Sequence, residues 1–247
     1  RRALGLPVRS VRIAAWWTRD YASALSGQLR ALVPVPTAGA LGRGVAPGRP
    51  VVVLLPGVYE RWRFLLPLAR ALREQGFAVV PAPELGWNRR GLDRSVARVA
   101  AGALRRVPAG YPVLMIGHSK GGLIGRALLD QTGSPVAARN DVALLTVATP
   151  FRGSRYASWF LDPAIRHLRP SDPSLTPLAA ATPESNARVT ALVPRFDPHV
   201  PTAEPLPGAR TRVIPVPGHF WSVRSRQGVA IIVAEARAIS DGLSAGA

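Results

Sequence analysis

The sequence predicts an α/β fold: a mostly parallel sheet with helices on both faces. Short apolar runs alternate with longer segments of helical periodicity from residue 51 to the end of the chain. The runs lack the alternating polarity of half-exposed strands, as the Val-Val-Val-Leu-Leu of 51–55 illustrates, so we expect both sheet faces to be covered. With 47% hydrophobic residues in 247, the chain can build a substantial core.

The expected elements follow one another in a regular order. Strands are expected at 51–55, 77–80, 113–116, 142–148, 189–193 and 212–216. Helices are expected at 62–75, 92–107, 121–131 and 229–239. This alternation implies parallel pairing through right-handed crossovers.

Residues 1–50 are expected to be an N-terminal helix and a Pro/Gly-rich linker packed on a domain formed by 51–247. Apolar residues recur at spacings of three and four over 10–32, with arginines between them. Such a segment could lie on a membrane surface, but packing against the domain is the favoured interpretation. Residues 34–50 contain four prolines and four glycines, which is typical of a linker or long loop.

Residues 151–188 interrupt the alternation. This insert holds five prolines and several large apolar residues, among them Trp159 and Phe160. Its composition favours a lid over a binding site, with a loop that only seals the core as the alternative.

Composition excludes several classes of function. The chain has no cysteine, which excludes disulfides and thiolate metal sites. Its net charge of +18 is almost entirely arginine, because Lys120 is the only lysine. The arginines are dispersed without interleaved aromatics, so nucleic-acid binding is not expected, whereas attraction to anionic surfaces or acidic substrates is. No apolar stretch is long enough to span a bilayer, and secreted and cytoplasmic locations both stay open.

The segment 113–122, Val-Leu-Met-Ile-Gly-His-Ser-Lys-Gly-Gly, is the strongest functional motif. A Gly-x-Ser-x-Gly pentapeptide between a strand and a helix predicts a nucleophile elbow centred on Ser119. Gly117 and Gly121 stand where a side chain would clash in so sharp a turn. The following helix directs its positive dipole end at the serine.

His219 is the preferred base for Ser119. It lies in Pro-Gly-His-Phe-Trp directly after the last strand, and open parallel sheets place their sites at such strand ends. An imidazole of pKa ~6.5 can accept the serine proton and later return it. His199 is the reserve, His118 is expected to face the wrong way within the elbow, and His167 lies in the insert.

Asp197 is the preferred acid to orient that histidine. It follows the strand at 189–193 and gives the chain order Ser119, Asp197, His219. The alternative is a turn residue that bonds its own backbone. Three other aspartates are weaker candidates because of their positions: Asp141, Asp162 and Asp172.

An oxyanion hole needs backbone N–H groups near the serine. We expect these donors from Lys120, the residue after the nucleophile, and from Val58 in the loop after the first strand of the sheet. The Lys120 side chain is expected to be solvated on the helix surface.

These residues resemble the α/β-hydrolase superfamily, and within it the bacterial triacylglycerol lipases and carboxylesterases. The matching motifs span residues 50–240 in the family's order: 52–57, 117–122, 148–154, 196–201 and 218–219. The resemblance implies Ser119, Asp197 and His219 as a catalytic triad, with main-chain donors at Val58 and Lys120. The chain departs from the family at 56–57, which is Pro-Gly where many of these lipases have His-Gly, at Lys120, where Met or Gln is common, and in the Pro-His pair at 198–199.

The predicted function is hydrolysis of carboxylic esters with lipid-like or apolar acyl groups, without cofactor or metal. Acyl transfer by the same triad, or a binding module that has kept the fold without catalysis, are the alternatives. Residues expected to line the substrate pocket or form the lid are Tyr59, His118, Trp159 and Phe160.

Overall fold

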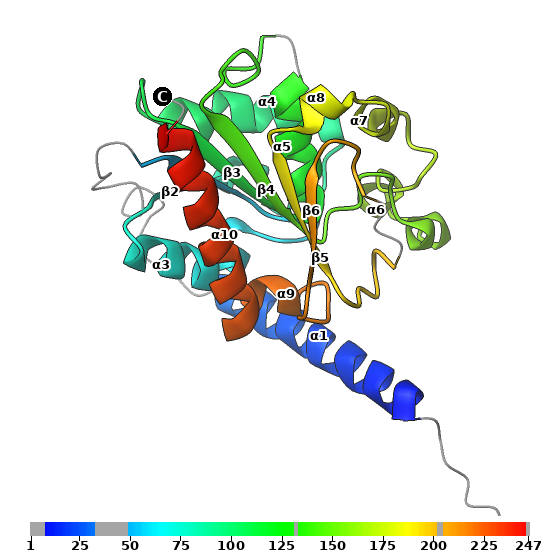
Figure 1. Ribbon diagram of the computed structural model, residues 1–247. Helices are drawn as coiled ribbons and strands as arrows, with labels where there is room; N and C mark the ends of the chain where they lie inside the picture. The colour runs from blue at the N-terminus through cyan, green and yellow to red at the C-terminus, as the bar shows by residue number, and fades with distance from the viewer. Residues whose placement is uncertain (1–7, 33–48, 131–132, 202–204, 246–247) are drawn as a thin grey trace, which may run out of the picture.

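The computed structural model describes residues 8–32, 49–130, 133–201 and 205–245, so most of the predicted linker at 34–50 lies outside the described residues (Figure 1). A six-stranded sheet in the order β2-β1-β3-β4-β5-β6 forms the centre, and every neighbouring pair is parallel. The strands are β1 Val51–Leu55, β2 Ala78–Pro81, β3 Val113–His118, β4 Val142–Val147, β5 Val189–Pro194 and β6 Arg210–Ile214. The predicted parallel α/β fold is confirmed.

The strand order reverses between β1 and β3. The chain runs from β1 outward to β2, then returns across β1 to β3 and continues in the opposite direction. Leu55 at the end of β1 pairs with Gly117, directly before the elbow. A reversal of this kind opens a crevice at the carboxyl ends of the two strands, which is where open α/β sheets bind ligands.

Helices cover both faces of the sheet, as Figure 1 shows. They are α3 Leu66–Glu74, α4 Leu92–Ala101, α5 Lys120–Asp130, α9 Trp221–Arg224 and α10 Arg226–Ala245. A 3₁₀ turn at Trp62–Leu65 replaces the start of the helix expected at 62–75, since Pro67 is favourable only in a first helical turn. The helix expected at 92–107 ends at Ala101, because Gly102 leaves the helical conformation with φ −113° and ψ −90°, and a separate 3₁₀ turn follows at Leu104–Arg106.

Two apolar cores result from the two faces. Val51, Val53 and Leu55 pack with α4 and α5 on one side, while Val52 and Leu54 pack with α3 and α10 on the other. All five side chains are buried, which explains why β1 shows no alternating polarity.

β6 departs from the expected pattern of buried strands. It is the sheet edge, and Arg210 and Arg212 are exposed along it. Both arginines form ion pairs with Glu235 of α10. Charged side chains on an edge strand discourage pairing with another chain, so the arginines protect this edge.

Helix α1, Val8–Leu32, projects from the domain, and its C-terminal half packs against the Trp62–Leu65 turn and α9 (Figure 1). Asp20, Ser23 and Ala31 are buried on the packed face. The exposed large apolar side chains of this helix recur every four residues: Trp17, Tyr21, Leu25 and Leu29. No helix in the described part of the chain is long and apolar enough to cross a membrane.

The insert at 151–188 folds into short helical pieces beside the carboxyl ends of the strands. They are Arg155–Trp159, α6 Pro163–Arg166, Pro173–Leu175, α7 Thr176–Ala179 and α8 Pro183–Asn186. Asp162 and Asp172 cap two of these pieces by accepting hydrogen bonds from backbone N–H groups, and Asp172 also pairs with His167. Asp141 pairs with Arg139. The competing aspartates thus have structural partners other than His219.

Candidate active site

Ser119 lies in a strained turn between β3 and α5. Its φ of 51° is in the left-handed region, which a residue with a side chain rarely adopts. Two backbone hydrogen bonds hold it there: the Ser119 N–H donates to the Val147 carbonyl at 2.9 Å, and the Gly122 N–H donates to the Ser119 carbonyl at 3.0 Å. Strain of this kind costs free energy and is typical of functional positions.

The flanking glycines are required by contact rather than by backbone conformation. A Cβ at Gly117 would overlap the backbone of Gly122, and a Cβ at Gly121 would overlap the Leu55 carbonyl oxygen at the end of β1. Because neither glycine has a Cβ, the start of α5 can approach the carboxyl end of β1.

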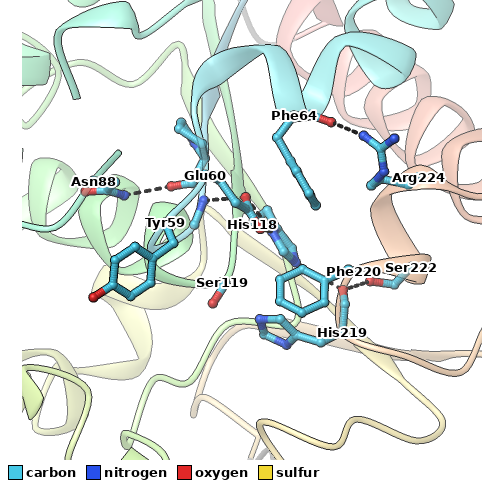
Figure 2. A network of polar contacts seen from close by, with 12 residues as sticks. Tyr59, Glu60, Phe64, Asn88, His118, Ser119, His219, Phe220, Ser222 and Arg224 are labelled. Atoms are coloured by element: carbon cyan, nitrogen blue, oxygen red, sulfur yellow. Dashed lines mark hydrogen bonds and ion pairs between the residues drawn. The ribbon is translucent and has the colours of Figure 1, made fainter. Parts of the chain in front are cut away.

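A cavity of about 440 Å³ opens above the serine. Ser119 and His219 both line it, and Figure 2 shows the serine hydroxyl beside the His219 ring. The loop after β1 contributes Val58, Tyr59 and Glu60 to its wall. The other lining residues come from α1, the insert and the loops after β4, β5 and β6: Tyr21, Ala24, Gln28, Pro150, Ser154, Tyr156, Ala157, Phe160, Asp162, Ile165, Leu168, His199, Val200 and Phe220.

Asp197 and His219 meet at the ends of β5 and β6. The His219 Nδ1 lies 2.8 Å from Asp197 Oδ2. The other carboxylate oxygen accepts the N–H groups of His199 at 2.8 Å and Val200 at 2.9 Å. Asp197 is therefore a turn residue and a partner of His219 at once. Burial opposes its ionisation, but the charge and hydrogen bond of His219 and the two N–H donors hold the pKa of Asp197 below its usual value.

The environment of His219 favours its protonated form. Burial by itself lowers the pKa of the imidazole, but the Asp197 charge and hydrogen bond oppose it, and Glu60 and Asp20 add negative charge. Together these carboxylates raise the pKa of His219 above its usual 6.5. Such a site stabilises the imidazolium that forms when His219 accepts a proton.

The loop after β1 carries the first expected oxyanion donor, Val58, which lines the cavity beside Ser119. Three contacts brace this loop. The Gly57 N–H donates to Glu60 at 2.7 Å, Asn88 Nδ2 donates to the Pro56 carbonyl at 2.8 Å, and the Tyr59 hydroxyl donates to Asp162 of the insert. Tyr59 itself has a φ of 60°. These contacts hold the loop in place, and donors held in place are what an oxyanion hole requires.

His118, which was expected among the pocket residues, does not line the cavity. It lies behind His219, with 4.9 Å between the ring centroids, and is 1% exposed (Figure 2). The His118 Nδ1 meets the Glu60 carboxylate at 2.8 Å, and its Nε2 lies 3.1 Å from the His219 carbonyl oxygen. Both ring nitrogens are therefore occupied, and His118 links the loop after β1 to the backbone of His219.

The Lys120 side chain is not solvated, contrary to expectation. It is 1% exposed, and its Nζ donates to the backbone carbonyls of Asn88, at 3.0 Å, and of Arg90. Burial lowers its pKa to about 8. The reason is the tight entry of α5, which places the side chain of its first residue under the loop after β2. The Lys120 N–H is in the first turn of α5, where backbone donors have no partner within the helix.

The remaining candidates divide between the cavity wall and its surroundings. Tyr59 and Phe160 line the cavity, whereas Trp159 does not and is 77% exposed. His199, the reserve base, packs with its ring centroid 5.0 Å from that of His219. Burial, with the nearby His219 charge, lowers the pKa of His199 to about 4. His167 lies outside this cavity, in the insert.

The residues whose hydrogen bonds hold the loops of the site were not identified from the sequence. Asp20 and Gln28 of α1 reach the His219 loop and the loop after β1, and Glu60 and Asn88 brace the latter loop. Asp20 could have been noticed as the only acidic residue in a 25-residue helix. In the described part of the chain, no cluster of three or more His, Cys, Asp or Glu side chains could hold a metal ion.

Comparison with solved structures shows the fold. A metagenomic carboxyl esterase superposes with a TM-score of 0.60 at 18% identity, covering 85% of this chain and 79% of the esterase. A metagenome-derived enzyme from the lipolytic pair LipS and LipT gives 0.55 at 15% identity, covering 81% and 98%. Est1E from Butyrivibrio proteoclasticus gives 0.53 at 14% identity, covering 80% and 89%.

No family model and no curated protein sequence matches the chain. The structural similarity, together with the parallel sheet and the turn at the end of β3, confirms the predicted fold: the chain has the α/β-hydrolase fold.

Proposed function

We propose that this protein is a serine esterase that hydrolyses carboxylic esters with apolar acyl groups. The observation that carries the proposal is that two of the three groups line one cavity and the third is hydrogen-bonded to His219. Ser119 stands in a strained turn on the cavity wall, His219 stands beside it, and Asp197 holds the far nitrogen of His219 at 2.8 Å. A nucleophile, a base and an orienting acid in this relation are the requirements of acyl transfer.

In the first half of the reaction, His219 Nε2 takes the proton of the Ser119 hydroxyl while the serine oxygen attacks the ester carbonyl. The carbonyl oxygen becomes an oxyanion, which the N–H groups of Val58 and Lys120 stabilise. When the tetrahedral intermediate collapses, His219 gives its proton to the leaving alcohol. The acyl group then remains as an ester on Ser119.

In the second half, His219 takes a proton from a water molecule that attacks this acyl-enzyme. The second tetrahedral intermediate collapses to the free carboxylic acid, and the proton returns to the Ser119 oxygen. Asp197 stays ionised throughout, as the lowered pKa of its carboxyl favours, and stabilises the imidazolium formed in both halves.

The lining of the cavity supports an apolar acyl group as the substrate. Its wall includes Ala157, Ile165 and Leu168 from the insert and Phe220 from the loop that bears His219. Its volume of about 440 Å³ lies within the range of small-molecule pockets. We therefore expect p-nitrophenyl esters of short and medium acyl chains to be turned over with higher kcat/KM than the palmitate ester.

The Ser119→Ala variant tests the proposal. Loss of the nucleophile should reduce turnover of p-nitrophenyl butyrate by at least about 10³-fold. Circular dichroism and thermal melting should show an intact fold, since the change removes one hydroxyl. Release of butyric acid, measured by chromatography, establishes hydrolysis. Turnover by the variant at the wild-type rate would refute the assignment of Ser119.

A further inference from the structure

Helix α1 reaches the base of the candidate site through one buried carboxylate. Asp20 is fully buried, and it accepts the backbone N–H groups of His219 at 3.0 Å, Phe220 at 2.8 Å and Trp221 at 2.8 Å. Burial raises the pKa of Asp20, while the Trp221 N–H and the His219 charge act in the opposite direction. Three N–H donors on one carboxylate form a charge-assisted site that fixes this loop.

The three donors belong to the start of α9, which has no cap of its own. Phe220 is the residue before the helix, and its side chain makes no capping hydrogen bond. The first N–H groups of a helix need an acceptor, and Asp20 supplies it from about 200 residues away. Gly218, with a φ of 105°, passes so close that a side chain there would overlap Asp20 Oδ1.

The carbonyl of His219 is held from the opposite direction. His118 Nε2 lies 3.1 Å from this oxygen, and the Ser222 hydroxyl donates to it at 2.7 Å. The backbone of His219 is therefore held at its N–H by Asp20 of α1. Its carbonyl is held by His118 and Ser222 (Figure 2). Asp197 holds the ring itself at Nδ1, so the imidazole is constrained through its backbone and through one ring nitrogen.

Two turns along the same helix, Gln28 holds the loop that bears Val58. The Gln28 Nε2 donates to the Tyr59 carbonyl at 2.6 Å. Between these two contacts, Tyr21 and Ala24 form part of the cavity wall. The Tyr21 ring centroid also lies 5.5 Å from that of His199, whose ring is tilted against that of His219. One helix thus touches the base loop, the oxyanion loop and the substrate cavity.

We propose that α1 is a working part of the active site, in which Asp20 is a positioning residue for His219 and Gln28 is a positioning residue for the oxyanion loop. The inference rests on the proposed function, because it assigns roles relative to Ser119, His219 and Val58. It predicts that activity depends on the packing of α1 against the domain, although α1 lies outside the central α/β layers.

Full-length Asp20→Asn tests the first role. The substitution keeps the size of the side chain but removes its charge and replaces one acceptor oxygen by an NH₂ group. Plateau kcat/KM for p-nitrophenyl butyrate should fall roughly 10- to 100-fold, since small displacements of a catalytic group have effects of this size. KM should change by less than kcat does.

The pH profile separates positioning from mere stability. The groups that face His219 are Asp197, Asp20, Glu60 and the rings of His118 and His199. Asp20 is one of the negative charges that raise the pKa of His219, so its removal should move the acid limb of kcat/KM to lower pH. Gln28→Met, a neutral change, should lower kcat without moving this limb.

Ser23→Ala is the matched control, because Ser23 is buried in the same helix and its hydroxyl makes no hydrogen bond to either loop among the described residues. It should keep activity within about twofold of wild type, with melting temperatures measured for every variant. The inference is overturned by an Asp20→Asn enzyme with wild-type kcat and acid limb, or by an equal loss of activity in Ser23→Ala. A wild-type protein that hydrolyses no ester and reacts with no fluorophosphonate would instead contradict the proposed function.

Discussion

Two buried histidines, whose ring centroids lie 4.9 Å apart, show what distinguishes a candidate base from a residue that only supports the site. His219 and His118 each place Nδ1 at 2.8 Å from a carboxylate, Asp197 for the first and Glu60 for the second. They differ at the other nitrogen. The His118 Nε2 lies against a backbone carbonyl, whereas His219 lines the cavity that Ser119 also lines. The position at the cavity, and not the carboxylate partner, therefore distinguishes the proposed base from the other buried histidine.

The largest expected effect on activity is the difference between two single variants, one for each histidine. His219→Gln should reduce kcat/KM by at least about 10³-fold, because Ser119 loses its base. His118→Gln should cost about tenfold or less, since its Nε2 contact is with a backbone carbonyl. Steady-state kinetics with p-nitrophenyl butyrate measures both. Equal losses in the two variants would break the distinction drawn between these residues.

The carboxylate partners of the two histidines, Glu60 and Asp197, should differ in whether their replacement affects stability or activity. Glu60→Gln should lower the free energy of unfolding by about 1–3 kcal/mol, because Glu60 holds both the Gly57 N–H and His118 in a buried setting. Asp197→Asn should affect kcat far more than stability, since the amide favours the wrong tautomer of His219. Urea denaturation together with kinetics gives both quantities, and a reversed order of effects would count against the assignment.

The smallest expected effect concerns Lys120, a third buried group behind the site. Its pKa is about 8 in the folded protein and 10.5 without burial, so between these pH values the unfolded chain holds more protons. Stability should therefore increase with pH across this interval, by about 1–3 kcal/mol relative to Lys120→Met.

NMR titration of the single lysine reports its pKa directly. A pKa near 10.5 would show that the side chain is solvated and does not hold the loop after β2.

Strands and the groups at their carboxyl ends could be predicted because their signals are local. The apolar runs fix β1 to β5 closely, and Ser119, Asp197 and His219 each follow such a run. The structure brings Asp197 and His219 within hydrogen-bond distance, while the catalytic roles stay predictions. The resemblance to known lipases made the pairing of these distant residues easier to anticipate.

The residues that support the site could not be predicted, because their partners are distant in the sequence and their residue types are ordinary. Asp20 meets His219 at a separation of 199 residues, and no spacing or periodicity marks that contact. Lys120 was expected in solvent because charged helix residues usually are, yet the tight elbow turns its side chain under the loop at 88–90. His118 is next to Ser119 in the chain, yet it is the last residue of β3 and its side chain is bound to Glu60 and the His219 carbonyl, away from the cavity.

Reaction with a fluorophosphonate probe tests the central claim most directly, since the probe labels only an activated serine. Intact-mass analysis followed by peptide mapping should find one adduct on wild-type protein, located at Ser119. The adduct should be lost in Ser119→Ala and form at least about 10²-fold more slowly in His219→Gln, while His118→Gln is labelled at nearly the wild-type rate. An unlabelled wild-type protein, or an adduct on another serine, would contradict the account.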